Sequence, residues 1–251
     1  MAFHTEKQLY EYEVLGADTD YHDSLQLHTL FTMLQEAASM NAATRGFGAK
    51  DMDRLDICWL LLRMSVDMKR LPNWQEKVYV KTWSLGYEKL LFSRDFEIYD
   101  EQNNQIGEAH SAWLIADKKS HRPIRPSSIE GMEAFLSPNI EYSLVTPRIN
   151  PIVIQGETDQ LPIICKYADY CEIDRNMHVN NTKYIAWSLD AIHSNSIETP
   201  IVKKIDINYS SEVKFGEKVL MYTTVTDQTI QVDGFEAASN RHVFSSIATL
   251  S

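Results

Sequence analysis

A polar cluster between residues 171 and 184 contains the residue types that acid–base chemistry requires. It reads Cys-Glu-Ile-Asp-Arg-Asn-Met-His-Val-Asn-Asn-Thr-Lys-Tyr. Asp174, Asn176 and His178 stand two residues apart, and in an extended segment alternate side chains project to the same side. We therefore expect these three side chains to converge on one pocket, where a carboxylate and an imidazole can move protons.

A helix is predicted directly after this cluster, because apolar residues recur at helical spacing from Tyr184 to Ile192. Asn180 or Asn181 can cap it by accepting a hydrogen bond from a free backbone N–H group. The N-terminal N–H groups of a helix also favour developing negative charge. The cluster and the helix start together form the candidate active site.

Two other interpretations of the same stretch are weaker. Cys171 could be a nucleophile paired with His178, but we expect a small buried thiol instead. The Asp-x-Asn-x-His pattern resembles a calcium loop, yet Val179 and Ile185 stand where such a loop has glycine and glutamate. We therefore predict no metal site.

Length, composition and charge exclude several classes of protein. The chain has 251 residues, 44% of them hydrophobic, so it can bury one large core or two small ones. Its net charge of −11 argues against general nucleic-acid binding. Three scattered cysteines indicate a reducing compartment. No run of ~20 apolar residues predicts a membrane span, and no secretory signal is recognisable. We expect a cytoplasmic protein, with the oligomeric state open, a homodimer included.

The same succession of predicted elements occurs twice. The first copy comprises a strand within 3–17, a helix from 27 ended by Gly46, a polar loop at 49–56, and strands at 57–70, 77–85, 91–99 and 105–117. After a proline-rich stretch, the second comprises a strand at 163–168, a helix at 181–194, and strands at 202–211, 218–226, 230–237 and 242–250. This order indicates an internal duplication.

The two copies also align residue by residue. A shift of 154 (174 minus 20) pairs three polar residues: Asp20 with Asp174, His22 with Asn176, and Ser24 with His178. Farther along, a shift of 141 (217 minus 76) places Glu76 on Glu217. The second copy has therefore lost 13 residues between helix and sheet, which is 154 minus 141.

A strand, a long helix and an antiparallel sheet that buries one face of the helix make an α+β unit in which the sheet curls around the helix. This is the hotdog arrangement, and two copies side by side would pair into one continuous sheet without an exposed edge between them. We predict a tandem (double) hotdog, with an N-terminal hotdog at 1–125, a linker at 126–162 and a C-terminal hotdog at 163–251.

The second-copy motif, from Asp174 to Trp187, resembles the signature of the acyl-[acyl carrier protein] thioesterases. Further likeness lies in the first copy, at Leu34-Gln35-Glu36-Ala37, Trp59 to Met68, Pro72-x-Trp74, Thr82-Trp83, Arg94-Asp95-Phe96 and Trp113-Leu114-Ile115-x-Asp117-Lys118-Lys119. The resemblance covers nearly the whole chain. Plant members of this family have a leading transit segment that we do not find here, so a bacterial-type enzyme is expected.

The resemblance implies a catalytic glutamate in a Tyr-x-x-Glu context, which Tyr209 to Glu212 supplies. Some relatives have a cysteine at the next position, where this chain has Val213. The first-copy counterpart of Glu212 is Leu71, and that of His178 is Ser24. We therefore infer one active site per chain, with Asp174, Asn176, His178 and Glu212 as its catalytic residues and the first copy holding the acyl tail.

The implied reaction hydrolyses the thioester of acyl-[acyl carrier protein] to a free fatty acid and the carrier protein, which ends fatty acid synthesis. Asp174 or Glu212 would polarise water, His178 would assist proton transfer, and Asn176 would orient the reactants. Direct attack by Asp174, forming an anhydride, is an alternative. No cofactor is required, because the thiolate of a phosphopantetheine arm is a good leaving group.

Two further sets of residues are predicted from the same reasoning. Candidates to line an acyl channel are apolar residues of the first helix and its sheet: Leu30, Met33, Leu34, Met40, Met64, Val66 and Met68. Acyl carrier protein is acidic, so candidates to dock it are basic residues: Lys118, Lys119, His121, Arg122 and Arg125 in one cluster, Lys203, Lys204 and Lys214 in another, and Arg175 beside the site.

Other functions on the same fold remain as alternatives. An acyl-coenzyme A thioesterase is the nearest. A hotdog enoyl-thioester hydratase is less consistent, since its motif has a proline after the asparagine and a histidine three residues beyond it, whereas Met177 and His178 follow Asn176 here. A non-catalytic acyl-binding module would not need the full polar set.

Overall fold

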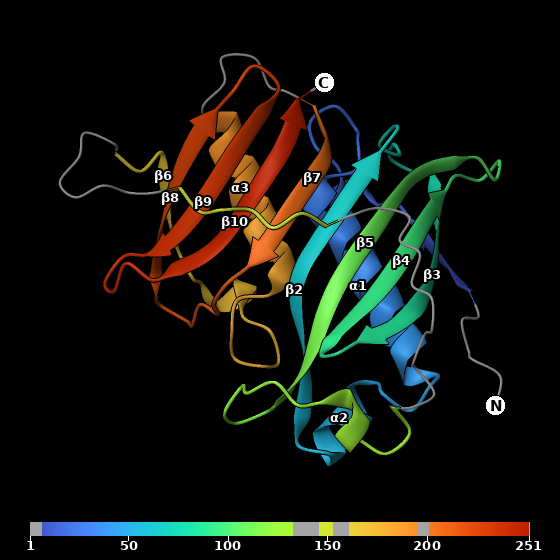
Figure 1. Ribbon diagram of the computed structural model, residues 1–251. Coiled ribbons are helices and arrows are strands. Elements are labelled where there is room, and N and C mark those ends of the chain that lie inside the picture. The colour runs from blue at the N-terminus through green and yellow to red at the C-terminus, as the bar shows by residue number, and fades with distance from the viewer. Residues whose placement is uncertain (1–6, 133–145, 153–160, 195–200, 251) are drawn as a thin grey trace. The chain divides into compact units, whose positions relative to one another are not determined.

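The computed structural model describes residues 7–132, 146–152, 161–194 and 201–250. The chain divides into two compact units, Met1–Thr146 and Pro147–Ser251. In each unit a long helix packs against one antiparallel sheet (Figure 1). The predicted α+β double hotdog is therefore confirmed, and the boundary between the units falls within residues 126–162.

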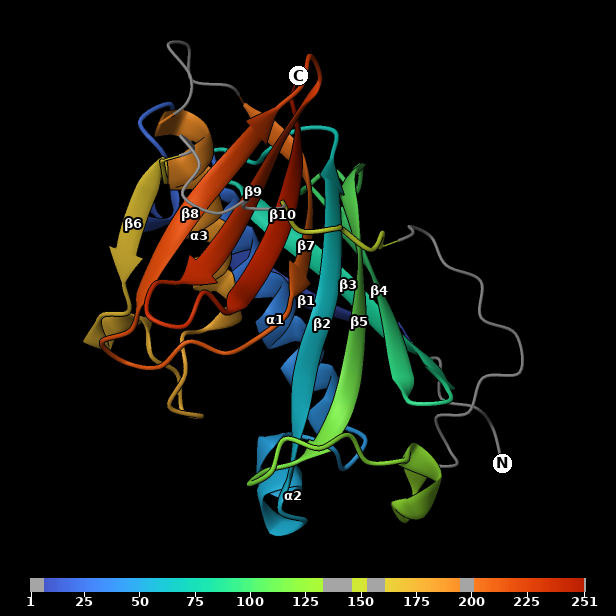
Figure 2. The same cartoon turned by 60° about the vertical axis from the view of Figure 1, so that its left-hand side comes forward.

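The first unit has a five-stranded sheet around helix α1 (Leu27–Ala43). Its strands are β1 (Gln8–Glu13), β2 (Ile57–Met68), β3 (Lys77–Glu88), β4 (Leu91–Tyr99) and β5 (Gln105–Asp117). Their order is β1-β3-β4-β5-β2, with every neighbouring pair antiparallel. Single turns of 3-10 helix lie at Gly16–Asp18 and Pro126–Ser128. Figure 2 shows the same strands in a view turned about the vertical axis.

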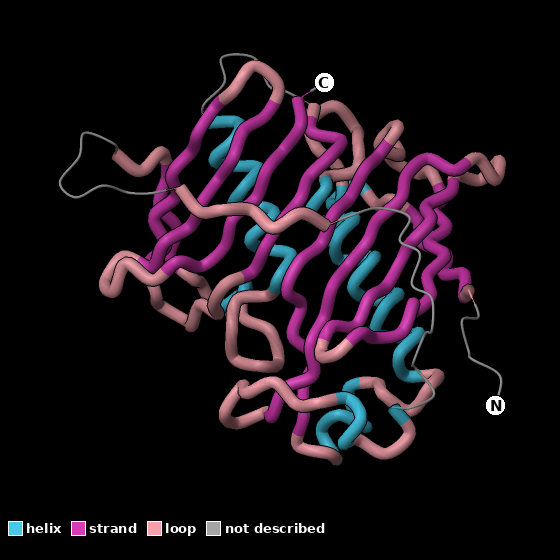
Figure 3. Tube along the Cα trace, in the orientation of Figure 1, coloured by secondary structure: helices cyan, strands magenta, loops and turns pink. Residues whose placement is uncertain are grey.

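The second unit repeats this plan around helix α3 (Asn181–Ser194). Its strands are β6 (Ile164–Tyr167), β7 (Val202–Tyr209), β8 (Lys218–Val225), β9 (Thr229–Glu236) and β10 (His242–Leu250). Read from β6, their order is β6-β8-β9-β10-β7, which matches the first unit strand for strand. A 3-10 turn at Tyr170–Glu172 corresponds to Gly16–Asp18. Figure 3 shows the same alternation of helix, loop and strand in both units, so the predicted duplication is confirmed.

Both helices bury an apolar stripe against the concave face of their own sheet. Helix α1 buries Leu30 and Leu34 completely, and helix α3 does the same with Ile185 and Ile192. Each such side chain contributes about 1.5–3 kcal/mol relative to an exposed position. Burial of these stripes holds each helix in its sheet and thereby sets where its N-terminus lies.

One predicted loop of the first unit is a helix. The sequence predicted a polar loop at residues 49–56, but the structure has the short helix α2 (Ala49–Arg54) there. Its only buried residue, Met52, packs with Phe47, Ile57 and other apolar side chains of a small core cluster. Six residues are too few for a periodic signal, and an isolated helix of this length is unstable, so tertiary burial decides this element.

None of the helices in the described part of the chain combines the length and the apolar character that crossing a membrane requires.

Candidate active site

The segment that connects β6 to α3 forms a tight turn at Asp174 to His178. The Asp174 N–H donates to the His178 carbonyl at 2.8 Å, and the Met177 N–H donates to the Asp174 carbonyl at 3.0 Å. The Asp174 side chain closes the turn, since its Oδ1 accepts the Asn176 N–H at 2.7 Å. The prediction of an extended segment with alternating side chains was therefore wrong: Met177 has a φ of +67° and Asn176 is exposed.

Backbone pairing joins the Asp174 turn to the segment that precedes β8. His178 and Lys214 form an isolated antiparallel bridge, and the Val179 N–H donates to the Val213 carbonyl at 2.8 Å. The imidazole Nε2 of His178 lies 3.3 Å from the Oε2 of Glu212. The His178 side chain is 16% exposed and that of Glu212 37%, so the pair is reachable from solvent. Glu212 and His178, which lie 34 residues apart (212 minus 178), meet here.

The backbone of Glu212 is anchored by an arginine from the turn between β9 and β10. Arg241 Nη1 donates to the Glu212 carbonyl at 2.6 Å, and its Nη2 donates to Glu217 Oε2 at 3.1 Å. Glu217 also accepts the Lys214 N–H at 3.0 Å. Sequence reasoning missed Arg241, because no local pattern links it to a segment about thirty residues earlier.

A buried phenol supports the same segment from helix α3. The Tyr184 hydroxyl accepts the N–H of Val213, the residue after Glu212, at 3.2 Å. Burial raises the pKa of Tyr184 above its usual 10.0, and the negative charges of Glu212 and Asp174 raise it further. The phenol is therefore neutral at any pH near neutrality.

Helix α3 begins with a side-chain cap, as predicted. Asn180 Oδ1 accepts the Thr182 N–H at 3.0 Å and the Thr182 hydroxyl at 2.9 Å. Of the two candidate caps, Asn180 therefore makes the hydrogen bonds. A second tyrosine, Tyr209, donates its hydroxyl to the Asn181 carbonyl at 3.2 Å. The positive end of the α3 dipole is thus held beside the His178 turn.

Glu172 lies in the same stretch, but its carboxylate has a structural role. Its Oε1 accepts the indole N–H of Trp187 at 2.9 Å, and its Oε2 accepts the Asp169 N–H at 3.1 Å. Both oxygens are engaged in holding the 3-10 turn to helix α3. This leaves Asp174 and Glu212 as the carboxylates that lie close to His178.

The Cys171 thiol is exposed, so the expectation of a buried thiol was wrong. Cys171 lies in the single 3-10 turn that precedes the Asp174 turn, where there is no core to bury it. Within the described residues, no group of three or more histidine, cysteine, aspartate or glutamate side chains could hold a metal ion.

The predicted channel residues belong to the interior of the first unit, with one exception. Leu30, Met33 and Leu34 of α1 are buried, as are Met64, Val66 and Met68 of β2, but Met40 is 41% exposed. Near the C-terminal end of α1, the buried position belongs to Asn41 instead of Met40. The buried members lie in helix α1 and strand β2.

The predicted docking residues divide between the two units. Lys118, Lys119, Arg122 and Arg125 are exposed after β5 of the first unit, where Lys118 Nζ forms an ion pair with Asp53 at 2.6 Å. Arg175 is exposed within the Asp174 turn itself. Lys214 is exposed as well, and its backbone bridge to His178 places it beside the same turn.

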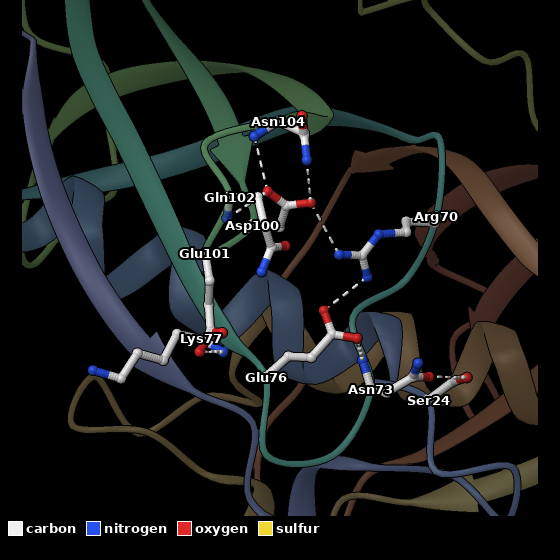
Figure 4. Close-up of polar contacts among 9 residues, drawn as sticks. All are labelled: Ser24, Arg70, Asn73, Glu76, Lys77, Asp100, Glu101, Gln102 and Asn104. Carbon is white, nitrogen blue, oxygen red and sulfur yellow. Dashed lines mark hydrogen bonds and ion pairs between the residues drawn. The ribbon is translucent and has the colours of Figure 1, made fainter.

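The first unit has a different set of side chains at the corresponding place (Figure 4). Ser24, the counterpart of His178, donates its hydroxyl to Asn73 Oδ1 at 3.4 Å. Arg70 lies between Glu76, at 2.8 Å, and Asp100, at 3.2 Å. The counterpart of Glu212 is Leu71, so the imidazole and carboxylate of the second unit have no equivalent here.

Comparison with known proteins gives two family matches. Residues 6–128 match the acyl-ACP thioesterase N-terminal domain, and residues 157–245 match the acyl-ACP thioesterase C-terminal domain. A chloroplastic palmitoyl-acyl carrier protein thioesterase of Gossypium hirsutum is 26% identical over 226 residues, covering 88% of this chain and 54% of that protein. Oleoyl-acyl carrier protein thioesterase 1 of Arabidopsis thaliana is 25% identical, covering 80% and 59%. This chain thus spans somewhat more than half the length of these relatives.

Solved structures match over the full chain. An acyl-ACP thioesterase from Bacteroides thetaiotaomicron has a TM-score of 0.82 at 23% identity, with 100% of both chains covered. A 12:0-ACP thioesterase from Umbellularia californica has a TM-score of 0.82 at 18% identity, covering 100% of this chain and 99% of that one. At these identities the structural likeness establishes the fold.

Proposed function

We propose that this chain, which belongs to the acyl-ACP thioesterase family, hydrolyses the thioester of acyl-[acyl carrier protein] to a free fatty acid and the carrier protein, and so ends fatty acid synthesis. The observation that carries the proposal is the contact of 3.3 Å between His178 and Glu212, beside the Asp174 turn and the capped start of α3. These groups correspond to the base, the proton carrier and the anion-stabilising dipole that thioester hydrolysis needs.

In the proposed reaction Glu212 accepts a proton from a water molecule as the water oxygen bonds to the thioester carbon. His178, in contact with Glu212, passes a proton to the sulfur as the carbon–sulfur bond breaks, and takes up in its place the proton that Glu212 received from the water. The products are a carboxylic acid and the thiol of the carrier. The α3 N-terminus lies near the developing oxyanion, and Asn176 orients the reactants from the exposed face of the turn.

Glu212 is the better candidate for the base of the two carboxylates. Asp174 already uses one oxygen to close the turn through the Asn176 N–H, whereas Glu212 contacts the imidazole directly. Asp174 then stabilises charge and holds the turn. Nucleophilic attack by Asp174 would use a carboxylate whose Oδ1 is tied into the turn, which makes it the less favoured route.

We further propose that the first unit holds the acyl tail. Its helix and sheet bury the predicted apolar lining, while Ser24 and Leu71 replace the reactive side chains. A cytoplasmic location is proposed from the three scattered cysteines, two of them exposed, which suit a reducing compartment. The homodimer stays a prediction.

The decisive experiment compares acyl carrier protein thioesters with the coenzyme A thioester of the same acyl group. Wild type should release thiol faster from the carrier protein; a preference for coenzyme A would instead favour the acyl-coenzyme A thioesterase. His178→Ala and Glu212→Ala should each lose at least ~100-fold in turnover. The matched variants Ser24→Ala and His22→Ala in the first unit should stay within about twofold, given the usual size of surface effects.

Formation of hydrated product from an enoyl thioester, without thiol release, would support the hydratase alternative. Saturable binding without any turnover would support the non-catalytic one. Cys171→Ala should retain activity, because Val213 and not cysteine follows Glu212 and no contact ties the Cys171 thiol to the His178–Glu212 pair among the described residues.

A further inference from the structure

Large apolar side chains surround the His178 turn on the outside of the second unit. Tyr170 is 83% exposed, Met177 72%, Phe215 64% and Tyr167 56%. Single exposed apolar residues are common on protein surfaces, but several gathered around one site mark an interaction surface. These four lie in four neighbouring segments: the end of β6, the 3-10 turn at Tyr170–Glu172, the Asp174 turn and the loop before β8.

Backbone contacts place these segments side by side. The Gly216 N–H donates to the Ala168 carbonyl at 2.9 Å, which joins the Phe215 loop to the stretch between Tyr167 and Tyr170. The bridge between His178 and Lys214 sets Met177 beside the same loop. The four apolar side chains therefore belong to segments that adjoin one another around the site.

Met177 is an unusual choice at its position. Its φ of +67° is a conformation that glycine, asparagine and aspartate adopt most readily. The first unit has Asp23 at the corresponding place, with a φ of +60°. The second unit thus presents a long, exposed, apolar side chain where the backbone favours a short polar one. Methionine is common on surfaces that bind other proteins because it adapts its shape.

Positive charges flank the apolar side chains. Arg175 and Lys214 are both exposed, two residues before Met177 and one before Phe215. Of the acids in these loops, Glu172 is engaged by Trp187 and the Asp169 N–H, and Glu217 by Arg241 and the Lys214 N–H, while the Asp169 side chain is exposed. In a chain with a net charge of −11, this rim is a local site for an acidic partner.

We infer that these six residues, Tyr167, Tyr170, Arg175, Met177, Lys214 and Phe215, form a docking rim for the acyl carrier protein. The inference rests on the proposed function and names the surface that function uses. A carrier whose thioester reaches Glu212 has to approach the loops around it, and Phe215 and Met177 lie three residues and one residue from the reacting pair. A second copy of this chain on the rim would obstruct that approach.

The test separates docking from chemistry by using one acyl group on two thiols. The carrier protein thioester needs the rim, whereas the N-acetylcysteamine thioester, which reproduces only the end of the phosphopantetheine arm, does not. Phe215→Glu adds a negative charge in the rim, and Met177→Asp restores the first-unit residue at a backbone position that accepts it. Each should lower kcat/KM for the carrier substrate at least ~10-fold, the loss typical of an interface anchor, with the small thioester unchanged within about twofold.

Trp74→Glu in the first unit is the matched control. Trp74 is the counterpart of Phe215 at the shift of 141 (215 minus 74), and it is 51% exposed. It should leave both substrates unaffected. If wild type cleaves both thioesters and the rim variants keep full carrier activity, the docking rim is wrong while the proposed function stands. The same conclusion holds if Trp74→Glu loses as much kcat/KM for the carrier substrate as the rim variants do. If wild type cleaves neither, the proposed function itself fails. A change from dimer to monomer in Phe215→Glu, with carrier activity kept, would reassign the rim to self-association.

Discussion

Residues 20–26 of the first unit and residues 174–180 of the second share a backbone but not a chemistry. The Asp20 N–H donates to the Ser24 carbonyl at 2.9 Å, as the Asp174 N–H does to His178. Asp20 Oδ1 accepts the His22 N–H at 2.8 Å, which repeats the contact from Asn176 to Asp174. Positive φ angles also recur at equivalent positions, Asp23 and Met177. The turn therefore forms without the reactive side chains that it carries in the second unit.

The same holds for the segment opposite each turn. The Leu25 N–H donates to the Pro72 carbonyl at 2.8 Å, just as the Val179 N–H donates to Val213. What differs is the side chain on each side of this pairing: Ser24 and Leu71 in one unit, His178 and Glu212 in the other. The two units thus place different side chains on the same backbone arrangement, at the two positions where we propose that they differ in function.

Each unit has an arginine–glutamate ion pair beside its turn, but the arginine comes from a different element in each unit. Glu76 is held by Arg70, which follows β2, and Glu217 is held by Arg241, which precedes β10. Because Arg241 reaches in from the β9–β10 turn, it can also bond the Glu212 carbonyl. The second unit therefore uses its structural cation to position a residue that the first unit lacks.

The sharpest way to break this comparison is to give the second unit the side chains of the first. The double variant His178→Ser with Glu212→Leu should lose ~1000-fold or more in thioester turnover and still fold, because the first unit folds with these residues. Each single variant should lose nearly as much, since residues that act as a unit are not additive. Turnover of the acyl carrier protein thioester and thermal unfolding measure the two effects. Substantial turnover in the double variant would contradict the site.

The variants Asp174→Ala and Asp20→Ala distinguish the contribution of the aspartate to the stability of the turn from its contribution to turnover. Both remove an acceptor that closes the same turn, so each should lower the free energy of unfolding by about 0.5–2 kcal/mol. Only Asp174→Ala should also lose turnover, by about 100-fold. Urea unfolding and steady-state kinetics on both variants give the answer. If Asp20→Ala lowers turnover equally, the first unit takes part in the chemistry.

Arg241→Gln tests positioning. Loss of the bond to the Glu212 carbonyl should lower kcat about 10-fold with KM little changed, because a slightly misplaced base is a poor base. Arg70→Gln, its functional counterpart in the first unit, should change stability only slightly, since this ion pair is partly exposed, and should leave kcat unaltered. A shift of the pH profile of kcat in Arg241→Gln but not in Arg70→Gln would distinguish positioning from a general loss of stability.

Buried phenols should make both units sensitive to alkali, with the smallest effect of this series. Burial raises the pKa of Tyr12 in the first unit from 10.0 to about 12. In the second unit, burial raises the pKa of Tyr184 and that of Tyr209 above the same usual value of 10.0. A raised pKa in the folded state stabilises the protein fully below pH 10, and this stability falls as the pH rises further. Tyr184→Phe should reduce the loss by up to about 1.4 kcal/mol per pH unit. Urea unfolding at about pH 9 and about pH 11 measures it; an unchanged alkaline loss in Tyr184→Phe would contradict the assignment.

Local patterns in the chain determined much of the fold. Helix α3 and strand β10 begin and end where periodicity predicted, because apolar residues that face one core repeat at the spacing of the element. The duplication followed from matching such elements across the two halves. Helix α2 escaped prediction, since a single buried methionine in six residues has no period.

The amino-acid sequence by itself determined which residues were available for the site: a carboxylate, an amide and an imidazole before a capped helix. Only the tertiary structure decided how they are used. The spacing of two residues suggested an extended segment, but hydrogen bonds from the Asp174 side chain fold it into a turn. Backbone pairing through Val213 then brings Glu212 to His178. Arg241, from the turn between β9 and β10, donates a hydrogen bond to the Glu212 carbonyl. Contacts between distant segments depend on how the sheet closes around the helix, and no local pattern encodes that geometry.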